Sequence, residues 1–279
     1  MTVINTNTGS LYAQQSLNLN ERGLASVMQQ LATGKRINSA VDDVAGMAIS
    51  TRLTSQIRGL NQAVRNANDG ISLIQTAEGA TEQVTNMLQR MRELAVQASN
   101  DTNNTSDRSY LNLEFQALTS QIDNIANYTQ WNGANVLNKT GGTSGVFTFQ
   151  VGANSGQSIS ITFDNMTTAS AAGVLSTIAG NNITGTTSSS AALGVIISAL
   201  DTVSYARSNM GAVISRLQFA GDNLANVSAK AQESRSRIED TDYSQATTEL
   251  AKRNIIQQAA QAMLAQANQA PQIVLQLLR

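Results

Sequence analysis

The sequence predicts a mainly α-helical protein with long antiparallel helical rods, coiled-coil termini and one small β-hairpin. Apolar residues recur every three or four positions over long stretches on both sides of the chain's centre, which is the period of a helix. Of the 279 residues, 41% are apolar, only 4% are aromatic, and proline occurs once. This composition is poor for one large globular core but suits Ala-rich helices that pack closely. Only residues 146–163 alternate in the manner of β-strands.

The first helix is predicted over residues 11–31. Leu17, Leu24 and Leu31 recur every seven residues, which gives the helix a narrow apolar seam. Gly34 follows at a position where a helix commonly ends in the left-handed conformation.

A charged joint comes next. Its four charged residues are Lys35, Arg36, Asp42 and Asp43. Asn38 or Ser39 is the expected N-cap of the following helix, and the two aspartates suit a helix N-terminus. These local roles favour capping and solvation over a reactive site.

The second helix is predicted to be very long, and the third to fold back on it. Helical spacing persists up to Ala98, and some fifty-five residues would form a rod of about 80 Å. Turn formers at 99–107 end it. The third seam steps four and three through Leu111, Phe115, Leu118, Ile122 and Ile125. This spacing is that of a coiled coil, so the two helices should pack antiparallel.

The middle of the chain is the least helical part. Residues 146–151 and 158–163 alternate in β-rich residues and predict a hairpin. Residues 164–190 are small, polar and weakly patterned. We interpret them as a surface connection with little structure of its own.

The second half repeats the pattern in reverse order. A long helical rod begins at Leu193 and leads to a second charged joint. The charged residues of that joint include Arg235, Arg237, Glu239 and Asp240. The last helix has an apolar seam that contains Ile256, Met263, Val274 and Leu277. Pro271 should kink or weaken this helix. Because alanine fills much of the seam, we expect both chain ends to need neighbours for full order.

Composition also excludes several functions. The formal net charge is −1, so nothing suggests a nucleic-acid partner. The chain has no cysteine and no histidine, the commonest metal ligands and bases, so we expect no catalytic residues, no metal and no cofactor. No apolar run approaches the roughly 18 residues that span a bilayer, and the N-terminus does not resemble a secretory signal peptide. We therefore expect no membrane insertion and no enzyme.

Several long motifs resemble those of bacterial flagellins. The matching stretches are "INTNTGSLYAQQSLN" (4–18), "LATGKRINSAVDDVAGMAI" (31–49), "ANDGISLIQTAEGA" (67–80), "LQRMRELAVQASN" (88–100), "FQVGANSGQSISI" (149–161), "SRIEDTDYSQATTELAKRNIIQQAAQAMLAQAN" (236–268) and "VLQLLR" (274–279). Together they cover most of both ends at the expected distances. A single heptad would not be specific, whereas this set is.

The resemblance implies a domain organisation. Residues 1–43 and 236–279 would be paired terminal helices in the inner core of a hollow filament. Residues 44–235 would form the helical rods of the outer tube, with the hairpin at 146–163 and a short variable surface segment near 164–190. The chain resembles a minimal flagellin with little or no outer domain. The two charged joints would link core to tube and set the register between subunits.

The resemblance also implies partners and a location. The protein would polymerise with itself into an open helical filament that serves motility. A flagellar export chaperone, the filament cap and hook-junction proteins would be its other partners. The flagellar secretion apparatus would export it, without a cleaved signal peptide, to the extracellular flagellum.

One further surface follows from the resemblance. Arg90 and Leu94 match the principal contacts of the animal Toll-like receptor that senses flagellin, and Glu114 on the neighbouring helix matches another. All three would first serve subunit packing. Two alternatives stay open: a flagellin-like cell-surface protein whose Asn/Thr-rich loops at 138–145 and 164–190 bind glycans or adhere, and a hook–filament junction protein. An inserted metalloprotease, found in some flagellins, does not fit a chain without histidine.

Overall fold

The computed structural model describes residues 6–168 and 173–277, and the side-chain surroundings of those up to residue 269. Its elements in chain order are α1 (Thr8–Thr33), α2 (Val44–Ala98), α3 (Thr105–Tyr128), β1 (Gln130–Trp131), β2 (Ala134–Asn135), β3 (Val146–Gln150), β4 (Ser158–Thr162), α4 (Ser176–Ala179), α5 (Thr186–Glu239) and α6 (Tyr243–Leu277). The predicted fold class is confirmed, with helices dominating and two small antiparallel strand pairs between them.

The chain divides into two compact units. One comprises residues 1–57 and 229–279, and the other comprises residues 58–228. The division therefore falls inside α2 and α5, and not at the predicted boundaries after residues 43 and 235. Each predicted boundary instead lies close to the end of a helix.

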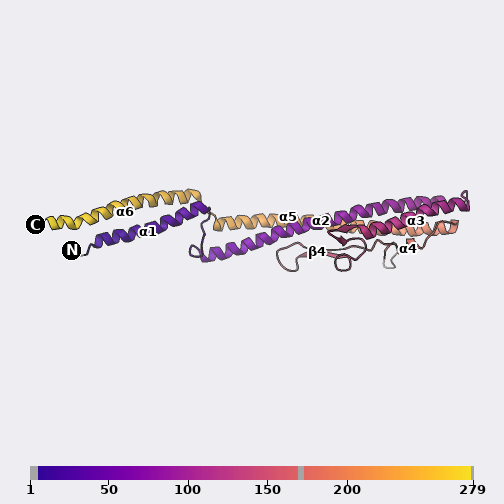
Figure 1. Ribbon diagram of the computed structural model, residues 1–279, viewed down its shortest axis with the longest axis horizontal. Helices are drawn as coiled ribbons and strands as arrows, with labels where there is room; N and C mark the ends of the chain where they lie inside the picture. Colours follow the sequence, from indigo (N-terminus) through magenta and orange to yellow (C-terminus); the bar gives the residue numbers. More distant parts are fainter. Residues whose placement is uncertain (1–5, 169–172, 278–279) are drawn as a thin grey trace. The chain divides into compact units, whose positions relative to one another are not determined.

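In the first unit, α1 and α6 lie side by side and antiparallel (Figure 1). The Asn7 side chain donates to the carbonyl of Ala267 at 2.7 Å, and the Asn20 side chain donates to the carbonyl of Arg253 at 2.9 Å. Early residues of α1 thus meet late residues of α6. The backbone of α6 stays helical through Pro271 to its last residue, so the predicted interruption does not end the helix.

In the second unit, α3 and α5 both run antiparallel to α2. Arg90 of α2 pairs with Glu114 of α3 at 2.9 Å, and Glu78 of α2 lies 3.8 Å from Arg207 of α5. The three helices share one core with the β3–β4 hairpin. Its largest fully buried side chains include Ile74, Leu88, Met91, Leu94, Phe115, Ile122, Ile161 and Phe163.

The predicted hairpin is confirmed and packs on α2. Residue Val146 pairs with Thr162 and Gln150 pairs with Ser158 in the antiparallel ladder. The ring of Phe149 lies where a Cβ on Gly70 would come within 3.0 Å of it. The glycine therefore lets the hairpin approach the helix backbone closely.

The structure also contains a second, smaller hairpin, which the sequence analysis did not predict. Strands β1 and β2 are joined by Asn132 and Gly133, both of which have positive φ, at 48° and 78°. Asn-Gly is the strongest short-range signal for such a two-residue turn. The signal was present, but the strands are too short to show an alternating pattern.

The prediction for residues 164–190 is wrong for the described part of that segment. Its side chains at Met166, Leu175, Ile178 and Ile183 are buried in the core, and α5 already begins at Thr186. The carboxylate of Asp123 accepts from both the backbone N–H and the hydroxyl of Thr168, at 2.6 and 2.7 Å. The apolar residues are spaced irregularly because they fill gaps in a core that other elements form.

Helix α5 contains a stretch that is long and apolar enough, by length and composition, to cross a membrane, with a mean hydropathy of 1.3. In this fold its apolar side chains at Ile196, Ala199 and Val203 lie in the core of the second unit. Of that stretch, 33% is buried inside the fold.

Candidate assembly site

The two predicted joints pair with each other through their backbones within one chain. Lys35 and Asp240 face each other in an antiparallel bridge. The backbone N–H of Arg36 donates to the carbonyl of Glu239 at 2.6 Å, and its guanidinium donates to the carbonyl of Ile238 at 2.8 Å. The joint is therefore a two-stranded connection, which residues far apart in the sequence form together.

The carboxylate of Glu239 is the electrostatic centre of the joint. It accepts from the Lys35 ammonium at 2.5 Å and from the Ser50 hydroxyl at 2.5 Å. Arg235 lies 3.9 Å away and also donates to the hydroxyl of Thr54 at 3.3 Å. The hydrogen bonds from Lys35 and Ser50 hold the pKa of the Glu239 carboxyl below its ordinary value of 4.5. The charged form of Glu239 is thus favoured by Lys35 just after α1, Ser50 near the start of α2 and Arg235 near the end of α5.

The two aspartates of the first joint have local roles. Asp42 accepts from the backbone N–H groups of Asn38 and Ser39 at 3.0 and 2.8 Å, which lower the pKa of its carboxyl. Asp43 accepts from the N–H of Gly46 at 2.8 Å and caps the start of α2. The predicted N-cap at Asn38 or Ser39 is wrong, because the chain makes an Asp-stabilised turn before the helix begins.

The remaining joint residue, Arg237, does not reach the first joint. Its guanidinium donates to Glu233 one turn earlier on α5, at 2.6 Å. Gly34 ends α1 in the left-handed conformation, with φ 71°, as predicted. Its carbonyl accepts from the N–H of Thr241 at 2.9 Å, which ties the end of α1 to the turn before α6.

A heptad seam joins α1 to α6. On α1, buried and half-buried positions recur at Ser10, Ala13, Leu17, Asn20, Leu24, Val27 and Leu31. On α6 they recur at Ala246, Leu250, Arg253, Gln257, Ala260, Leu264 and Ala267. Leu17, Leu24 and Leu31 thus lie where the sequence placed them. Both rows alternate in steps of three and four, which is the spacing of a coiled coil.

Two of the predicted seam residues of α6, Ile256 and Met263, do not belong to this row. Ile256 and Met263 are exposed, the latter by 60%. The side chains of Val274 and Leu277 lie outside the described residues. Alanine and glutamine supply much of the row that faces α1, so the larger apolar residues of α6 were mistaken for it.

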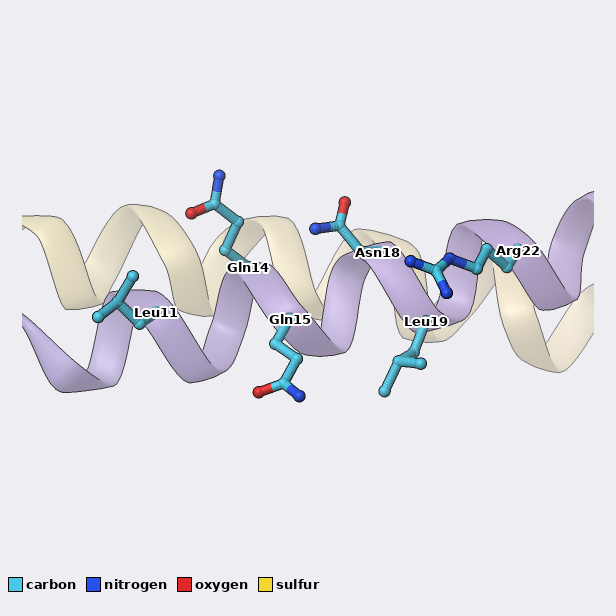
Figure 2. Close-up of a pocket in the computed structure, with 6 residues that line it drawn as sticks. All are labelled: Leu11, Gln14, Gln15, Asn18, Leu19 and Arg22. Carbon is cyan, nitrogen blue, oxygen red and sulfur yellow. The ribbon is translucent and has the colours of Figure 1, made fainter.

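Both terminal helices carry large apolar side chains that the single chain leaves exposed. They include Leu11, Tyr12, Leu19 and Met28 on α1 and Ile255, Ile256 and Met263 on α6, and these seven are hereafter called the outer apolar face. Figure 2 shows a shallow pocket of α1, lined by Leu11, Gln14, Gln15, Asn18, Leu19 and Arg22, with α6 passing behind. This face mixes apolar groups with amides that can donate and accept hydrogen bonds, as interfaces between subunits do.

The predicted receptor residues differ in how exposed their side chains are. Arg90 is half exposed and pairs with Glu93 and Glu114, each at 2.9 Å, which raises the pKa of its guanidinium. Leu94 is only 1% exposed and lies in the core. Leu94 therefore cannot be a direct contact of any outside partner in this conformation, whereas Arg90 and Glu114 can.

Paired chain ends with an uncovered apolar face are typical of subunits that complete their packing against further copies. Comparison with known proteins agrees. The bacterial flagellin N-terminal helical region matches residues 4–141, and the bacterial flagellin C-terminal helical region matches residues 193–278. A flagellin of Halalkalibacterium halodurans is 46% identical over 99% of this chain and 100% of its own. A flagellin of Bacillus subtilis is 40% identical over 99% of both chains.

The same similarity is visible in three dimensions. The crystal structure of Bacillus cereus flagellin matches 57% of this chain and 88% of its own, with 28% identity and a TM-score of 0.50. The chain belongs to the bacterial flagellin family. It is a structural subunit of the extracellular flagellar filament that serves motility. Only residues 142–192 separate the two matched regions, so this is a short flagellin with a minimal variable region.

Proposed function

We propose that the α1–α6 pair lies in the inner core of the flagellar filament and that residues 44–235 form the tube around it. The observation that carries this proposal is the outer apolar face. One chain leaves these seven large apolar side chains exposed to water, and packing against other copies would bury them. A contact between unlike faces that does not close on itself generates an open helical polymer.

The joint would then transmit geometry between core and tube. Its central ion pair, Lys35–Glu239, is partly exposed on the lysine side, so it contributes little to stability. The backbone bonds around it fix how the strand leaving α1 meets the strand entering α6. This supports a role in orientation, which is what a repeating polymer requires of each subunit.

We further propose export by the flagellar secretion apparatus without a cleaved signal peptide, with a chaperone, the filament cap and hook-junction proteins as partners. The exposed apolar side chains Ile255, Ile256 and Met263 support a chaperone requirement, because an unassembled chain would otherwise show them to solvent. We also propose that the chain has no catalytic role and binds no cofactor, since it contains neither cysteine nor histidine.

A second function is recognition by the Toll-like flagellin receptor. The proposed contact surface is the exposed Arg90–Glu114 pair together with the groove beside it. That groove is lined by Gln89, Arg92, Glu93, Val96, Gln97 and Leu200. Arg90 can form charge-assisted hydrogen bonds with a partner carboxylate by exchanging one of its two glutamate partners.

The adhesive alternative has less support. Asn165, Thr167 and Thr168 were expected on a glycan-binding surface, but their side chains are buried and bonded within the protein. These three side chains are therefore not free to bind a sugar.

The test of the main proposal is seeded polymerisation followed by electron microscopy. The unchanged protein should form tubular filaments. Leu19→Lys should reduce the polymerised fraction at least about tenfold, because a charge placed in an apolar contact costs more than 1.4 kcal/mol. Gln29→Lys adds the same charge at another exposed position of α1 and should polymerise far better. Equal polymerisation of the two variants would contradict the proposed role of the outer apolar face.

A further inference from the structure

The α1–α6 seam contains a polar cluster around Asn20 and Arg253. Asn20 is only 7% exposed, and its side-chain amide donates to the carbonyl of Arg253 at 2.9 Å. The guanidinium of Arg253 lies 3.0 Å from the carboxylate of Glu249 on the same helix. A buried amide in a coiled coil is a known means of selecting one register over others, at some cost in stability.

Gly23 of α1 leaves room for the side chain of Arg253 in this cluster. A Cβ on Gly23 would overlap the guanidinium nitrogen Nη1 and the Cζ of Arg253. The guanidinium is the far end of a flexible side chain, so any other residue at position 23 would displace it from this place. Gly23 lies inside α1, where glycine weakens a helix by about 0.5–1 kcal/mol relative to alanine. The space it leaves is used by one side chain of the partner helix.

The neighbouring registers offer no such space. If α6 slips by one heptad, about 10 Å along the axis, Arg253 leaves Gly23 and meets the region of Ser16 or Gln30. Both of these residues carry side chains. The rest of the seam distinguishes poorly between registers, because alanine recurs on α6 at 246, 260 and 267 and can face many residues.

We propose that Gly23, Arg253 and Asn20 form a register key, which allows α1 and α6 to pair only in the observed alignment. The key decides which residues of α1 lie beside which residues of α6 on the outer apolar face. This last consequence rests on the proposed filament core, whereas the alignment itself does not.

The geometry supplies a direct reporter of register. A Cβ on Gly9 would lie 3.9 Å from the Cβ of Ala267, within the range for a disulfide. The chain has no cysteine of its own, so Gly9→Cys with Ala267→Cys gives an unambiguous crosslink. Gly9→Cys with Ala260→Cys reports the alignment that is slipped by one heptad. Oxidation of seeded filaments and of the soluble chain, followed by electrophoresis, measures both crosslinks.

The expected result is a strong preference for the 9–267 crosslink in the reporter protein that retains Gly23, Arg253 and Asn20. Arg253→Leu should shift the ratio of the two crosslinks toward 9–260 by roughly tenfold, the middle of the range for coupled neighbours. Lys252→Leu removes the same charge from the adjacent, exposed position and should leave the ratio unchanged. An equal ratio in these two variants would overturn the proposal.

A double-mutant cycle provides a second measurement that does not depend on the loss of charge. Gly23→Ala should weaken the register preference although it raises helix propensity, and Ser26→Ala, an exposed position on the same helix, should not. Arg253→Ala should abolish the effect of Gly23→Ala, because the clash then disappears. Additive effects would overturn the key. If the unchanged reporter protein forms no filaments but shows the predicted ratios in the soluble chain, the proposed filament core fails and the key stands.

Discussion

Leu94 provides the sharpest test of how the second unit is built, because the family resemblance and the structure assign it different roles. Its side chain is 1% exposed in the core between α2 and α3. Leu94→Ala removes three carbon atoms from a closely packed site, and such changes cost about 2.7–5.0 kcal/mol in the Leu→Ala series of T4 lysozyme. For a chain of this size the midpoint of thermal unfolding should fall by about 2–4 °C per kcal/mol, or roughly 5–20 °C.

Val96→Ala is the matched control. Val96 lies two residues away on the same helix but is 56% exposed, so its truncation should change stability by about 0.5 kcal/mol or less. Thermal and urea unfolding of the full chain, followed by circular dichroism, measures both variants. Equal stability of the two variants would refute the burial of Leu94 and the packing of α2 on α3 that follows from it.

Comparing Leu94→Ala with Arg90→Ala separates a direct receptor contact from a structural role. In cells that express the flagellin receptor, Arg90→Ala should reduce the response to soluble protein while leaving its unfolding midpoint nearly unchanged. Leu94→Ala should reduce the response only as far as it unfolds the protein at the assay temperature. A fully folded, inactive Leu94→Ala protein would show that Leu94 contacts the receptor after a local rearrangement.

Two further outcomes follow from single contacts. Gly70→Val should destabilise the second unit by about 1–3 kcal/mol, because the added methyl groups overlap the ring of Phe149. Gly79→Val has open space around it and should be neutral or slightly stabilising. Urea unfolding distinguishes the two variants, and equal midpoints would contradict the close packing of the hairpin on α2. The pKa of Glu239 is lower in the folded chain than its ordinary value of 4.5, so its contribution to folding stability is fully present above about pH 4.5 and is lost as the pH falls through the lower value. Glu239→Gln should therefore reduce stability at neutral pH and flatten the acid side of the plot of stability against pH. An unchanged plot would show that the bonds from Lys35 and Ser50 contribute nothing to stability.

The helices themselves could be predicted because their signals are local. The recurrence of leucine every seven residues, the left-handed glycine at 34 and the turn formers after Ala98 act within a few residues of the element they define. The same holds for the alternating strands near 146–163. The family assignment was also within reach of the sequence, because its motifs are contiguous stretches of chain.

The assignment of faces was not predictable in this way. A helix rich in alanine can bury several different stripes, and the period of the pattern does not say which stripe meets a partner of the same chain. In α6 the apolar residues Ile256 and Met263 lie outside the seam with α1, whereas Ala260 and Gln257 lie in it. Arg253 lies in the same seam beside Gly23 of α1, and these two residues meet only after the chain has folded.

Burial in the second unit shows the same division. The sequence determined that α2, α3 and α5 are helices and roughly where they begin and end, since backbone hydrogen bonds and caps depend on near neighbours. Tertiary packing decided that Leu94 is inaccessible and that Met166 and Ile183 fill the core. It also decided that Lys35 meets Glu239, because the energy of that contact exists only when two segments some two hundred residues apart are brought together.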